Sequence, residues 1–432
     1  MKIIKEAIKT RNYKVGIIGL GYVGLPLAME FARSGFTTTG FEVDAEKVKA
    51  IARGASYIPD IPSSEVREFS KSGKLKATAD FSLLKNQDAV IICVPTPLRK
   101  SKDPDVSYIL NATGKVANNL RKGQIIILES TTYPGTTREL VRPMLEAAGM
   151  KAGRDFHLAF SPERVDPGNI EYGVKNTPKI VGGVTPACTK LAGLLYSQVV
   201  DTVIEVSNTE TAELVKLLEN TFRAVNIAMI NEMSLMCRKL GLNIWEVIAA
   251  AASKPFGFMP FYPGPGIGGH CIPLDPHYLG WKMKTLNFEP RFIELAGAVN
   301  SSMPYHTVSM ITELLNTRGK AMKASKLLMI GMTYKPDISD PRESPAKDVF
   351  ILLKKTQAEV DFYDPYVPSI EIDGRIHKGA RNALKNLKKY DCVIIITPHS
   401  CIDYPALVRG SKLVFDARNA AKNIKSPKIH RL

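Results

Sequence analysis

Residues 13–35 read YKVGIIGLGYVGLPLAMEFARSG, and this stretch decides the fold. It opens with a short apolar, β-branched run, passes through a glycine-rich turn and continues with apolar residues at helical spacing. Gly35 ends the helical pattern, as glycine does at many helix C-termini. This order of strand, glycine turn and helix predicts the first unit of a doubly wound α/β domain.

The turn contains GxGxxG, a weak motif by itself that becomes informative between a strand and a helix. We expect Gly19 to permit the tight turn and Gly21 to let a pyrophosphate approach the backbone at the helix N-terminus. Gly24 lets the helix and the strand pack closely. The alternative is a turn whose glycines serve packing alone.

The next apolar run, residues 37–44, ends near Glu42, eighteen residues after Gly24. A carboxylate at this place accepts hydrogen bonds from the ribose hydroxyls of NAD and repels the 2′-phosphate of NADP. We therefore expect NAD as the cofactor. Lys47, which lies nearby in sequence, is a weak argument against this preference.

Strand-like and helix-like stretches alternate in the first part of the chain and again after Lys326, which predicts parallel sheets. Between them, residues 209–240 carry apolar residues at three- and four-residue spacing, with no glycine or proline before Gly241, and predict one long amphipathic helix. Two more helical stretches follow, at residues 244–253 and 291–316. The further strand-like runs are DAVIICVPT (88–96), GQIIILEST (123–131), KLLMIGMTYK (326–335), AEVDFYDPYV (358–367), DCVIIITP (391–398) and KLVFDARN (412–419).

These patterns predict an α/β protein with two Rossmann-like, doubly wound parallel-sheet domains, bridged by a long helix and a helical central region. We place a cofactor-binding domain at residues 1–207, a helical central domain at 208–318 and a second Rossmann-like domain at 319–432.

The composition excludes several classes of protein. No uncharged apolar run approaches the ~18 residues of a membrane span, and the N-terminus lacks the features of a signal peptide, so we expect no membrane partner and a cytoplasmic location. The net charge is +16, but the basic residues are spread along the chain without interleaved aromatic residues, which favours small polyanions over nucleic acid. We expect the basic residues 421–432 to form a solvated tail.

The six cysteines are scattered and include no CxxC pair, which argues against disulfides and a zinc site, so no metal is expected. Five of them lie in apolar surroundings and suit small core or near-surface positions. These five are Cys93, Cys188, Cys237, Cys392 and Cys401.

Cys271 differs, because it lies in the glycine- and proline-rich segment 263–276, PGPGIGGHCIPLDP. Proline fits a helix only in its first turn, so a helix should begin near Pro273. Cys271 would then precede a helix N-terminus, where the dipole favours a thiolate. Asp275 lies one turn further on, close enough to handle protons. A buried structural cysteine is the alternative.

Polar residues in other segments suit the same chemistry. Lys216 and Asn220 lie one turn apart on the long helix and share a face. Lys216 could stabilise an oxyanion, or its ammonium could simply extend to solvent. Glu163 follows an apolar stretch and could act as an acid or base, or form a surface ion pair. Residues 129–137 follow a buried strand, at the sheet edge where ligands bind.

Taken together, these segments resemble the UDP-glucose/GDP-mannose dehydrogenase family over residues 13–420. Finer details resemble the subgroup of UDP-N-acetylhexosamine 6-dehydrogenases, although Glu42 replaces the aspartate that is commoner in the family. The blocks that carry the resemblance are GLGYVGLP, CVPTP, ESTTYPGTT, SPERVDPG, KLLENTFRAVNIA, KPFGFMPFYPGPGIGGHCIPLDPHYL and GMTYKPDISDPRESP.

The resemblance implies an NAD-dependent, four-electron oxidation of a C6 hydroxyl to a carboxylate, for polysaccharide or glycan precursor synthesis. Cys271 attacks the C6 aldehyde, and the thiohemiacetal is oxidised to a thioester. Asp275 and Thr132 position the water that hydrolyses the thioester, with help from Glu163. Lys216 and Asn220 stabilise the charge on the C6 oxygen.

The resemblance also implies binding residues and an assembly. The helical region should form a homodimer or a higher homo-oligomer. Residues implied at the cofactor are Gly19, Gly21, Tyr22, Val23, Gly24, Glu42, Lys47, Pro95, Thr96, Thr132 and Arg342. Residues implied at the UDP-sugar are Glu163, Arg164, Lys216, Asn220, Arg223, Phe261, Tyr262, Gly268 and Lys335.

The substrate expected from the subgroup is a UDP-N-acetylhexosamine, with UDP-N-acetylglucosamine favoured. UDP-N-acetylmannosamine and UDP-glucose are the alternatives, because no residue that we identify decides between the epimers. A 3-hydroxyacid or 6-phosphogluconate-type dehydrogenase shares the first domain and the long helix but lacks the glycine-loop cysteine. A catalytically silent nucleotide-sugar-binding protein is the remaining alternative.

Overall fold

The computed structural model describes the chain except residues 59, 100–102, 148, 165–168, 170, 270 and 271. The chain divides into two compact units, which we describe separately. Unit 1 consists of Met1–Glu219 with His277–Asn287, and unit 2 consists of Asn220–Pro276 with Phe288–Leu432. The division into three domains expected from the sequence stays a prediction.

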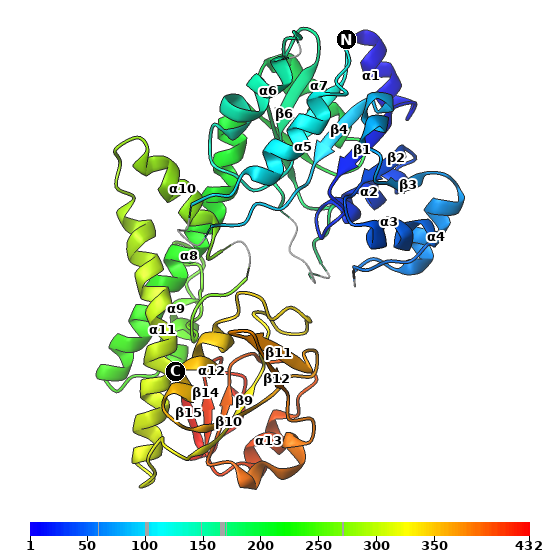
Figure 1. Cartoon of the computed structure of the whole chain (residues 1–432). Helices are drawn as coiled ribbons and strands as arrows, with labels where there is room; N and C mark the ends of the chain where they lie inside the picture. Colours follow the sequence, from blue (N-terminus) through cyan, green and yellow to red (C-terminus); the bar gives the residue numbers. More distant parts are fainter. Residues whose placement is uncertain (59, 100–102, 148, 165–168, 170, 270–271) are drawn as a thin grey trace. The chain divides into compact units, whose positions relative to one another are not determined.

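Unit 1 is built on an eight-stranded sheet with helices on both of its faces (Figure 1). The strand order is β3-β2-β1-β4-β5-β6-β7-β8, and the neighbours pair in parallel except β6 and β7, which are antiparallel. The strands are β1 (Lys14–Ile18), β2 (Thr37–Phe41), β3 (Leu75–Thr78), β4 (Ala89–Ile92), β5 (Ile125–Leu128), β6 (His157–Phe160), β7 (Lys179–Gly183) and β8 (Val203–Val206).

The central strands of this sheet are continuous apolar runs because helices cover both faces. The sequences AVII of β4 and IIIL of β5 are buried at every position. The helices of unit 1 are α1 (Lys2–Lys9), α2 (Gly24–Arg33), α3 (Ala45–Ala52), α4 (Ser63–Lys71), α5 (Ser107–Ala117), a π-helical turn (Thr137–Val141) that continues into α6 (Arg142–Glu146), and α7 (Pro186–Tyr196).

The long helix predicted from the sequence is α8 (Thr209–Lys239), which runs from unit 1 into unit 2. Further helices are α9 (Ile244–Ala251), α10 (Asp275–Lys284) and α11 (Arg291–Asn316). Helix α10 begins at Asp275, two residues after Pro273 and thus close to the expected start, and residues 272–274 form a turn before it. Pro276 therefore occupies the second helical position, where its missing N–H costs no hydrogen bond.

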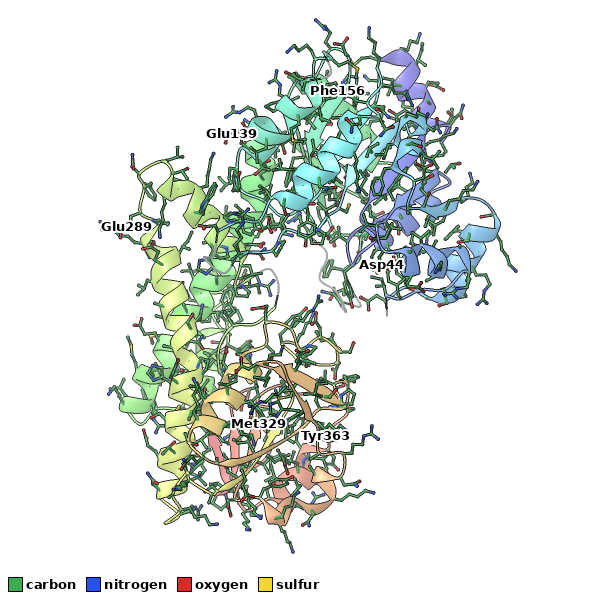
Figure 2. All side chains as sticks on the ribbon, viewed as in Figure 1. Asp44, Glu139, Phe156, Glu289, Met329 and Tyr363 are labelled. Carbon is green, nitrogen blue, oxygen red and sulfur yellow. The ribbon has the colours of Figure 1, made fainter. Side chains whose placement is uncertain are left out.

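Unit 2 contains a five-stranded parallel sheet in the order β10-β9-β13-β14-β15. Met329 of β9, one of the labelled residues in Figure 2, is fully buried in its core. The remaining elements are β9 (Lys326–Ile330), α12 (Pro345–Lys355), β10 (Glu359–Tyr363), the hairpin β11 (Ser369–Ile372) and β12 (Arg375–Lys378), β13 (Cys392–Ile395), α13 (Tyr404–Gly410), β14 (Val414–Asp416) and β15 (Ile429–Arg431).

One prediction about the C-terminus was wrong. Residues 421–432 are not a solvated tail, because Ile429–Arg431 form β15 and pair in parallel with β14. Leu432 is buried against the core of unit 2. The lysines of this segment suggested solvent, but strand pairing is made by the backbone and tolerates charged side chains at a sheet edge. The predicted fold class, with two doubly wound α/β sheets and a long helix, is confirmed.

Candidate active site

The three glycines of the turn in unit 1 differ in the space around them. Gly19 has φ +89°, and a Cβ there would lie 2.6 Å from the carbonyl oxygen of Cys93. A Cβ on Gly24 would lie 1.9 Å from the carbonyl oxygen of Gly19. A Cβ on Gly21 would meet no atom within 4 Å. The turn therefore needs Gly19 and Gly24 for its own packing, whereas the space at Gly21 fits a dinucleotide that approaches the backbone.

Glu42 lies directly after β2, buried beside this turn. Its carboxylate accepts hydrogen bonds from the backbone N–H of Leu20 at 2.9 Å, of Val43 at 2.9 Å and of Asp44 at 3.1 Å. The Nζ atom of Lys47 lies 3.8 Å from the same carboxylate. The structure therefore places a fixed negative charge next to the glycine turn, and Lys47 offsets it only in part.

Thr132 follows β5 in the segment that connects it to the next helix. Its hydroxyl lies 2.6 Å from the hydroxyl of Thr136, which in turn donates to the carbonyl oxygen of Tyr133 at 2.8 Å. Because the single proton of Thr136 is used in this way, Thr132 must be the donor of the hydroxyl pair. The lone pairs of Thr132 are therefore directed to accept a hydrogen bond, as from a bound water.

Lys216 and Glu163 are brought together in unit 1. The Nζ atom of Lys216 donates to the backbone carbonyl of Glu163 at 2.8 Å, and Lys216 is 6% exposed. Its ammonium is thus held inside the protein instead of extending to solvent. Arg164, the next residue, donates to Glu219 at 2.6 Å, so it takes part in an ion pair within the protein.

In unit 2, Asn220 and Asp275 form a second pair. The amide of Asn220 donates to the carboxylate of Asp275 at 2.6 Å, and the two residues are 9% and 2% exposed. Asp275 is the first residue of α10, where the helix dipole favours its negative charge. Asn220 follows Lys216 by one turn on α8, as the sequence spacing predicts.

The glycine-rich loop of unit 2 packs against the segment that follows β9. A Cβ on Gly268 would lie 2.8 Å from Cδ of Pro345 and 2.9 Å from the carbonyl oxygen of Glu343. The N–H of Gly269 donates to the same carbonyl at 3.3 Å. The structure therefore joins two segments, 263–269 and 334–345, that the sequence singled out separately. Cys271, the predicted nucleophile, lies outside the described residues.

The other residues implied at the UDP-sugar lie in unit 2. Phe261 packs edge-on against Phe222, and Tyr262 stacks on Trp245 with ring centroids 6.1 Å apart. Arg223 is exposed on α8. The backbone carbonyl of Lys335 accepts from Thr333 at 2.9 Å.

The other residues implied at the cofactor lie in both units. Tyr22 and Pro95 are exposed, Val23 is partly buried, and Thr96 accepts from the hydroxyl of Tyr278. Arg342, in unit 2, is exposed and pairs in bidentate fashion with Asp340. How these residues act on ligands stays a prediction.

Sequence reasoning missed Arg418, which follows β14 at the carboxyl end of the second sheet. A Cβ on Gly264 would lie 2.2 Å from Nη1 of Arg418, so this guanidinium packs directly on the glycine-rich loop. Desolvation lowers the pKa of Arg418 to about 10, and it forms no ion pair with any residue that the structure describes. An arginine without a counter-ion beside the loop suits an anionic ligand. Its position after an apolar strand was the available signal.

A second set of residues missed from the sequence lies at the strand ends of unit 1. Lys179 forms a buried ion pair with Glu129, which also accepts from the hydroxyl of Tyr196. Burial raises the pKa of Glu129, against the opposite effect of the Lys179 ammonium. The thiol of Cys93 is buried beside these charges, and burial raises its pKa as well. Cys93 therefore lacks the character of a reactive thiolate.

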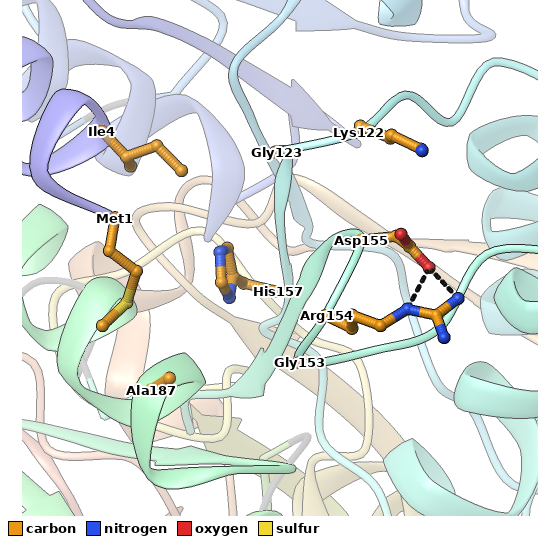
Figure 3. A pocket seen from close by; sticks show the side chains of 9 residues that line it. All are labelled: Met1, Ile4, Lys122, Gly123, Gly153, Arg154, Asp155, His157 and Ala187. Carbon is orange, nitrogen blue, oxygen red and sulfur yellow. Dashed lines mark hydrogen bonds and ion pairs between the residues drawn. The ribbon is translucent and has the colours of Figure 1, made fainter.

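A pocket of about 430 Å³ lies at the opposite, amino edge of the first sheet (Figure 3). Arg154, one of its cationic residues, is already paired with Asp155 at 2.7 Å, as the dashed lines in Figure 3 show. None of the predicted site residues lines this pocket. Its lining residues are Met1, Ile4, Lys122, Gly123, Gly153, Arg154, Asp155, His157 and Ala187.

The open glycine turn and the carboxylate that follows β2 define unit 1 as a dinucleotide-binding domain of the dehydrogenase class. The chain belongs to the UDP-glucose/GDP-mannose dehydrogenase family, whose three parts match in order. The NAD binding domain matches residues 13–200, the central domain residues 210–302 and the UDP binding domain residues 328–423. The protein is thus an NAD-dependent oxidoreductase, and the predicted cofactor is confirmed.

Individual relatives agree with this assignment. The chain is 35% identical to a UDP-N-acetyl-D-mannosamine dehydrogenase of Pyrococcus horikoshii, over 95% of this chain and 96% of the relative. It is 34% identical to a UDP-N-acetyl-D-glucosamine 6-dehydrogenase of Pseudomonas aeruginosa, over 90% and 91%. A solved structure of a UDP-D-ManNAc dehydrogenase from Pyrococcus horikoshii superposes with a TM-score of 0.86 and covers 97% of this chain and 98% of that one.

The described residues show neither a membrane-spanning helix nor a metal-binding cluster. No helix in this part of the chain is long and apolar enough to cross a membrane. No group of three or more histidine, cysteine, aspartate or glutamate side chains is placed to hold a metal ion within the same residues.

Proposed function

We propose that the protein oxidises the C6 hydroxyl of a UDP-N-acetylhexosamine to a carboxylate, through a thiohemiacetal and a thioester on Cys271. The observation that carries the proposal is the buried pair of Asn220 and Asp275, which lies at the start of the helix that follows the cysteine loop. A buried carboxylate with a bound amide, a few residues from a cysteine, suits the handling of protons during thioester chemistry.

NAD, held at the glycine turn beside Glu42, would supply the hydride acceptor for both oxidation steps at the C6 carbon. Lys216 and Asn220 stabilise the charge on the C6 oxygen. The Cys271 thiolate attacks the aldehyde carbon and forms a C–S bond, because a thiohemiacetal donates hydride more readily than an aldehyde. Thr132 accepts a hydrogen bond from the hydrolytic water, and Glu163 and Asp275 take up its protons. One alcohol, one water and two NAD give one carboxylate, two NADH and three protons.

The UDP moiety is proposed to lie at the carboxyl end of the second sheet. Arg418 supplies a cation there without a counter-ion among the described residues, and Lys335 lies in the loop that follows β9. Gly264 packs closely against Arg418 and Gly268 against Pro345, so the backbone of the glycine-rich loop lies at the same edge. A diphosphate that meets an arginine at such an edge is a common arrangement.

UDP-N-acetylglucosamine is the proposed substrate, and UDP-N-acetylmannosamine and UDP-glucose are the alternatives. The relatives support an acetamido sugar, since both acetamido epimers occur among their substrates by name. The uronic acid product suits the synthesis of polysaccharide precursors in the cytoplasm. The test measures kcat/KM for the three sugar nucleotides by NADH absorbance. We expect UDP-glucose to be at least about tenfold slower, since an unfilled acetamido pocket loses roughly 1–3 kcal/mol. Faster turnover of UDP-glucose would reject the acetamido substrate.

We also propose that the protein forms a homodimer through its helical region. Four apolar side chains on α8 are exposed in unit 2, namely Phe222, Met229, Met233 and Met236, with exposed fractions of 46%, 50%, 37% and 46%. Their spacings of seven, four and three residues place them on one face of the helix. An apolar face of this kind on an exposed helix is typical of a protein–protein contact.

A further inference from the structure

Glu213, on the first part of α8, is a buried carboxylate that neither the sequence motifs nor the proposed mechanism uses. It is 1% exposed. One oxygen accepts from the backbone N–H of Gly135 at 2.6 Å. The other accepts from the N–H of Thr137 at 2.9 Å and from its hydroxyl at 2.7 Å. A single side chain on α8 thus holds both residues that flank Thr136.

The partners of Glu213 that the structure describes are neutral hydrogen-bond donors. No lysine, arginine or histidine among the residues that the structure describes forms an ion pair with it. Burial raises the pKa of Glu213 to about 7, although the three hydrogen bonds from Gly135 and Thr137 act in the opposite direction. Glu210, one turn earlier, also raises this pKa. A buried acid without a counter-ion is costly to retain for packing alone.

The contacts of Glu213 lead to Thr132. Thr136 lies between the two residues that Glu213 holds, and its hydroxyl accepts the hydrogen bond from Thr132 at 2.6 Å. Gly135 has φ +102°, a backbone conformation that glycine adopts without strain. The orientation of the Thr132 oxygen therefore depends on the position of residues 135–137, which Glu213 fixes.

The contacts of Glu213 also lead to the proposed oxyanion residues. Glu213, Lys216 and Asn220 are separated by three and four residues, so they share one face of α8. A shift of residues 133–137 away from α8 would move Thr132 relative to Lys216. We propose that Glu213 is a positioning residue of the reaction, which fastens the Thr132 segment to the helix that carries Lys216. This inference rests on the proposed function.

The test compares Glu213→Gln with Glu210→Gln. The amide of the first variant is nearly isosteric, but its NH₂ group faces an N–H donor, so one of the three hydrogen bonds is lost. Glu210 is the matched control, because it lies one turn away, pairs with Arg138 at 2.7 Å and contacts neither Gly135 nor Thr137. We expect Glu213→Gln to lower kcat about tenfold or more, with KM for both substrates changed less than about threefold.

A double-mutant cycle with Thr132→Ala shows whether Glu213 acts through Thr132. If it does, the double variant loses no more kcat than the more damaging single variant, within about threefold. Losses that multiply in the double variant would overturn the inference, as would a kcat of Glu213→Gln equal to that of the control. Glu213→Asp, which keeps the charge with a shorter reach, serves as the second variant if the first does not fold.

A second readout does not depend on turnover. Hydrogen exchange of the peptide that spans residues 133–141 should be faster in Glu213→Gln than in the wild type and in Glu210→Gln, because the N–H of either Gly135 or Thr137 loses its acceptor. Unchanged exchange would overturn the inference. A wild-type protein that oxidises no sugar nucleotide, while the exchange still changes, would reject the proposed function and leave the structural role of Glu213 intact.

Discussion

Glu42 is the residue that we propose decides between the two nicotinamide cofactors. Its carboxylate is fixed by three backbone N–H groups and partly offset by Lys47 at 3.8 Å. A 2′-phosphate at the same place would meet this buried negative charge, which is costly. We predict that kcat/KM for NAD exceeds that for NADP by one to several orders of magnitude.

Charge removal at Glu42 tests this reasoning. Glu42→Gln should lower the ratio of kcat/KM for NAD to kcat/KM for NADP about tenfold or more, because the repulsion between residue 42 and the 2′-phosphate of NADP is lost. Glu46→Gln is the matched control, since Glu46 is exposed nearby and pairs with Lys49. A wild-type enzyme that uses both cofactors equally would show that Glu42 does not face the ribose.

Cys271 carries the covalent part of the proposed mechanism. Replacing it with alanine or serine should abolish net turnover, because no thioester can form and be hydrolysed. The Kd for NAD, measured by quenching of protein fluorescence, should remain within about threefold of the wild-type value, because the glycine turn is unchanged. Cys401→Ala, at an exposed cysteine, is the control and should turn over normally. Near wild-type turnover in Cys271→Ala contradicts the covalent mechanism.

At the scale of the element, the long helix α8 combines two different surfaces. Its buried face carries Glu213, Lys216 and Asn220, whereas the exposed apolar residues of unit 2 form the proposed dimer face. The two functions follow from one amphipathic sequence, because helical periodicity separates residues that are neighbours along the chain.

The exposed face of α8 makes a measurable prediction. We expect the wild type to have a molar mass of at least twice the 47.5 kDa of the chain in light scattering coupled to gel filtration. Met229→Lys should shift the mass towards the monomer, because a charge buried in an apolar interface is costly. Leu83→Lys, at an exposed apolar residue of unit 1, should leave the mass unchanged. A monomeric wild type contradicts the proposed dimer.

The link between α8 and residues 135–137 should also appear in the pH dependence of stability. The folded-state pKa of Glu213 is raised from 4.5 to about 7 by burial, so the folded state binds more protons than the unfolded state between these values. The contribution of Glu213 to the free energy of unfolding is therefore fully present below pH 4.5 and is lost as the pH rises to about 7. The Tm of Glu213→Gln minus the Tm of the wild type should therefore increase between pH 4.5 and about 7. A Tm difference that stays constant over this range contradicts the raised pKa of Glu213.

At the scale of the whole molecule, most of the fold could be predicted from the sequence. The glycine turn, the apolar runs of β4 and β5 and the long helix α8 carry strong periodic signals. The strand β15 could not be predicted, because Ile429–Arg431 is short and lies among lysines, and it is stabilised by pairing with β14. The antiparallel pairing of β6 and β7 could not be predicted either, because the direction of strand pairing depends on tertiary contacts.

The candidate site was predictable only in part. Glycine spacing predicts the turn, and in the structure a Cβ would clash at Gly19 but meets open space at Gly21. The role of Gly21 at the cofactor stays a prediction. The partners of Lys216 could not be predicted, because its contact with Glu163 joins residues 53 positions apart. Arg418 escaped notice for a similar reason, since only the folded chain places it on the glycine-rich loop.

The most direct test of the proposed chemistry is the number of NADH molecules formed per sugar consumed. A limiting amount of UDP-N-acetylglucosamine is incubated with excess NAD, NADH is counted by absorbance, and the product is identified by mass. Oxidation of a primary alcohol to a carboxylate removes four electrons, so we predict two NADH per sugar and a uronic acid as the product. One NADH per sugar, with an aldehyde or ketone as the product, would contradict the four-electron mechanism.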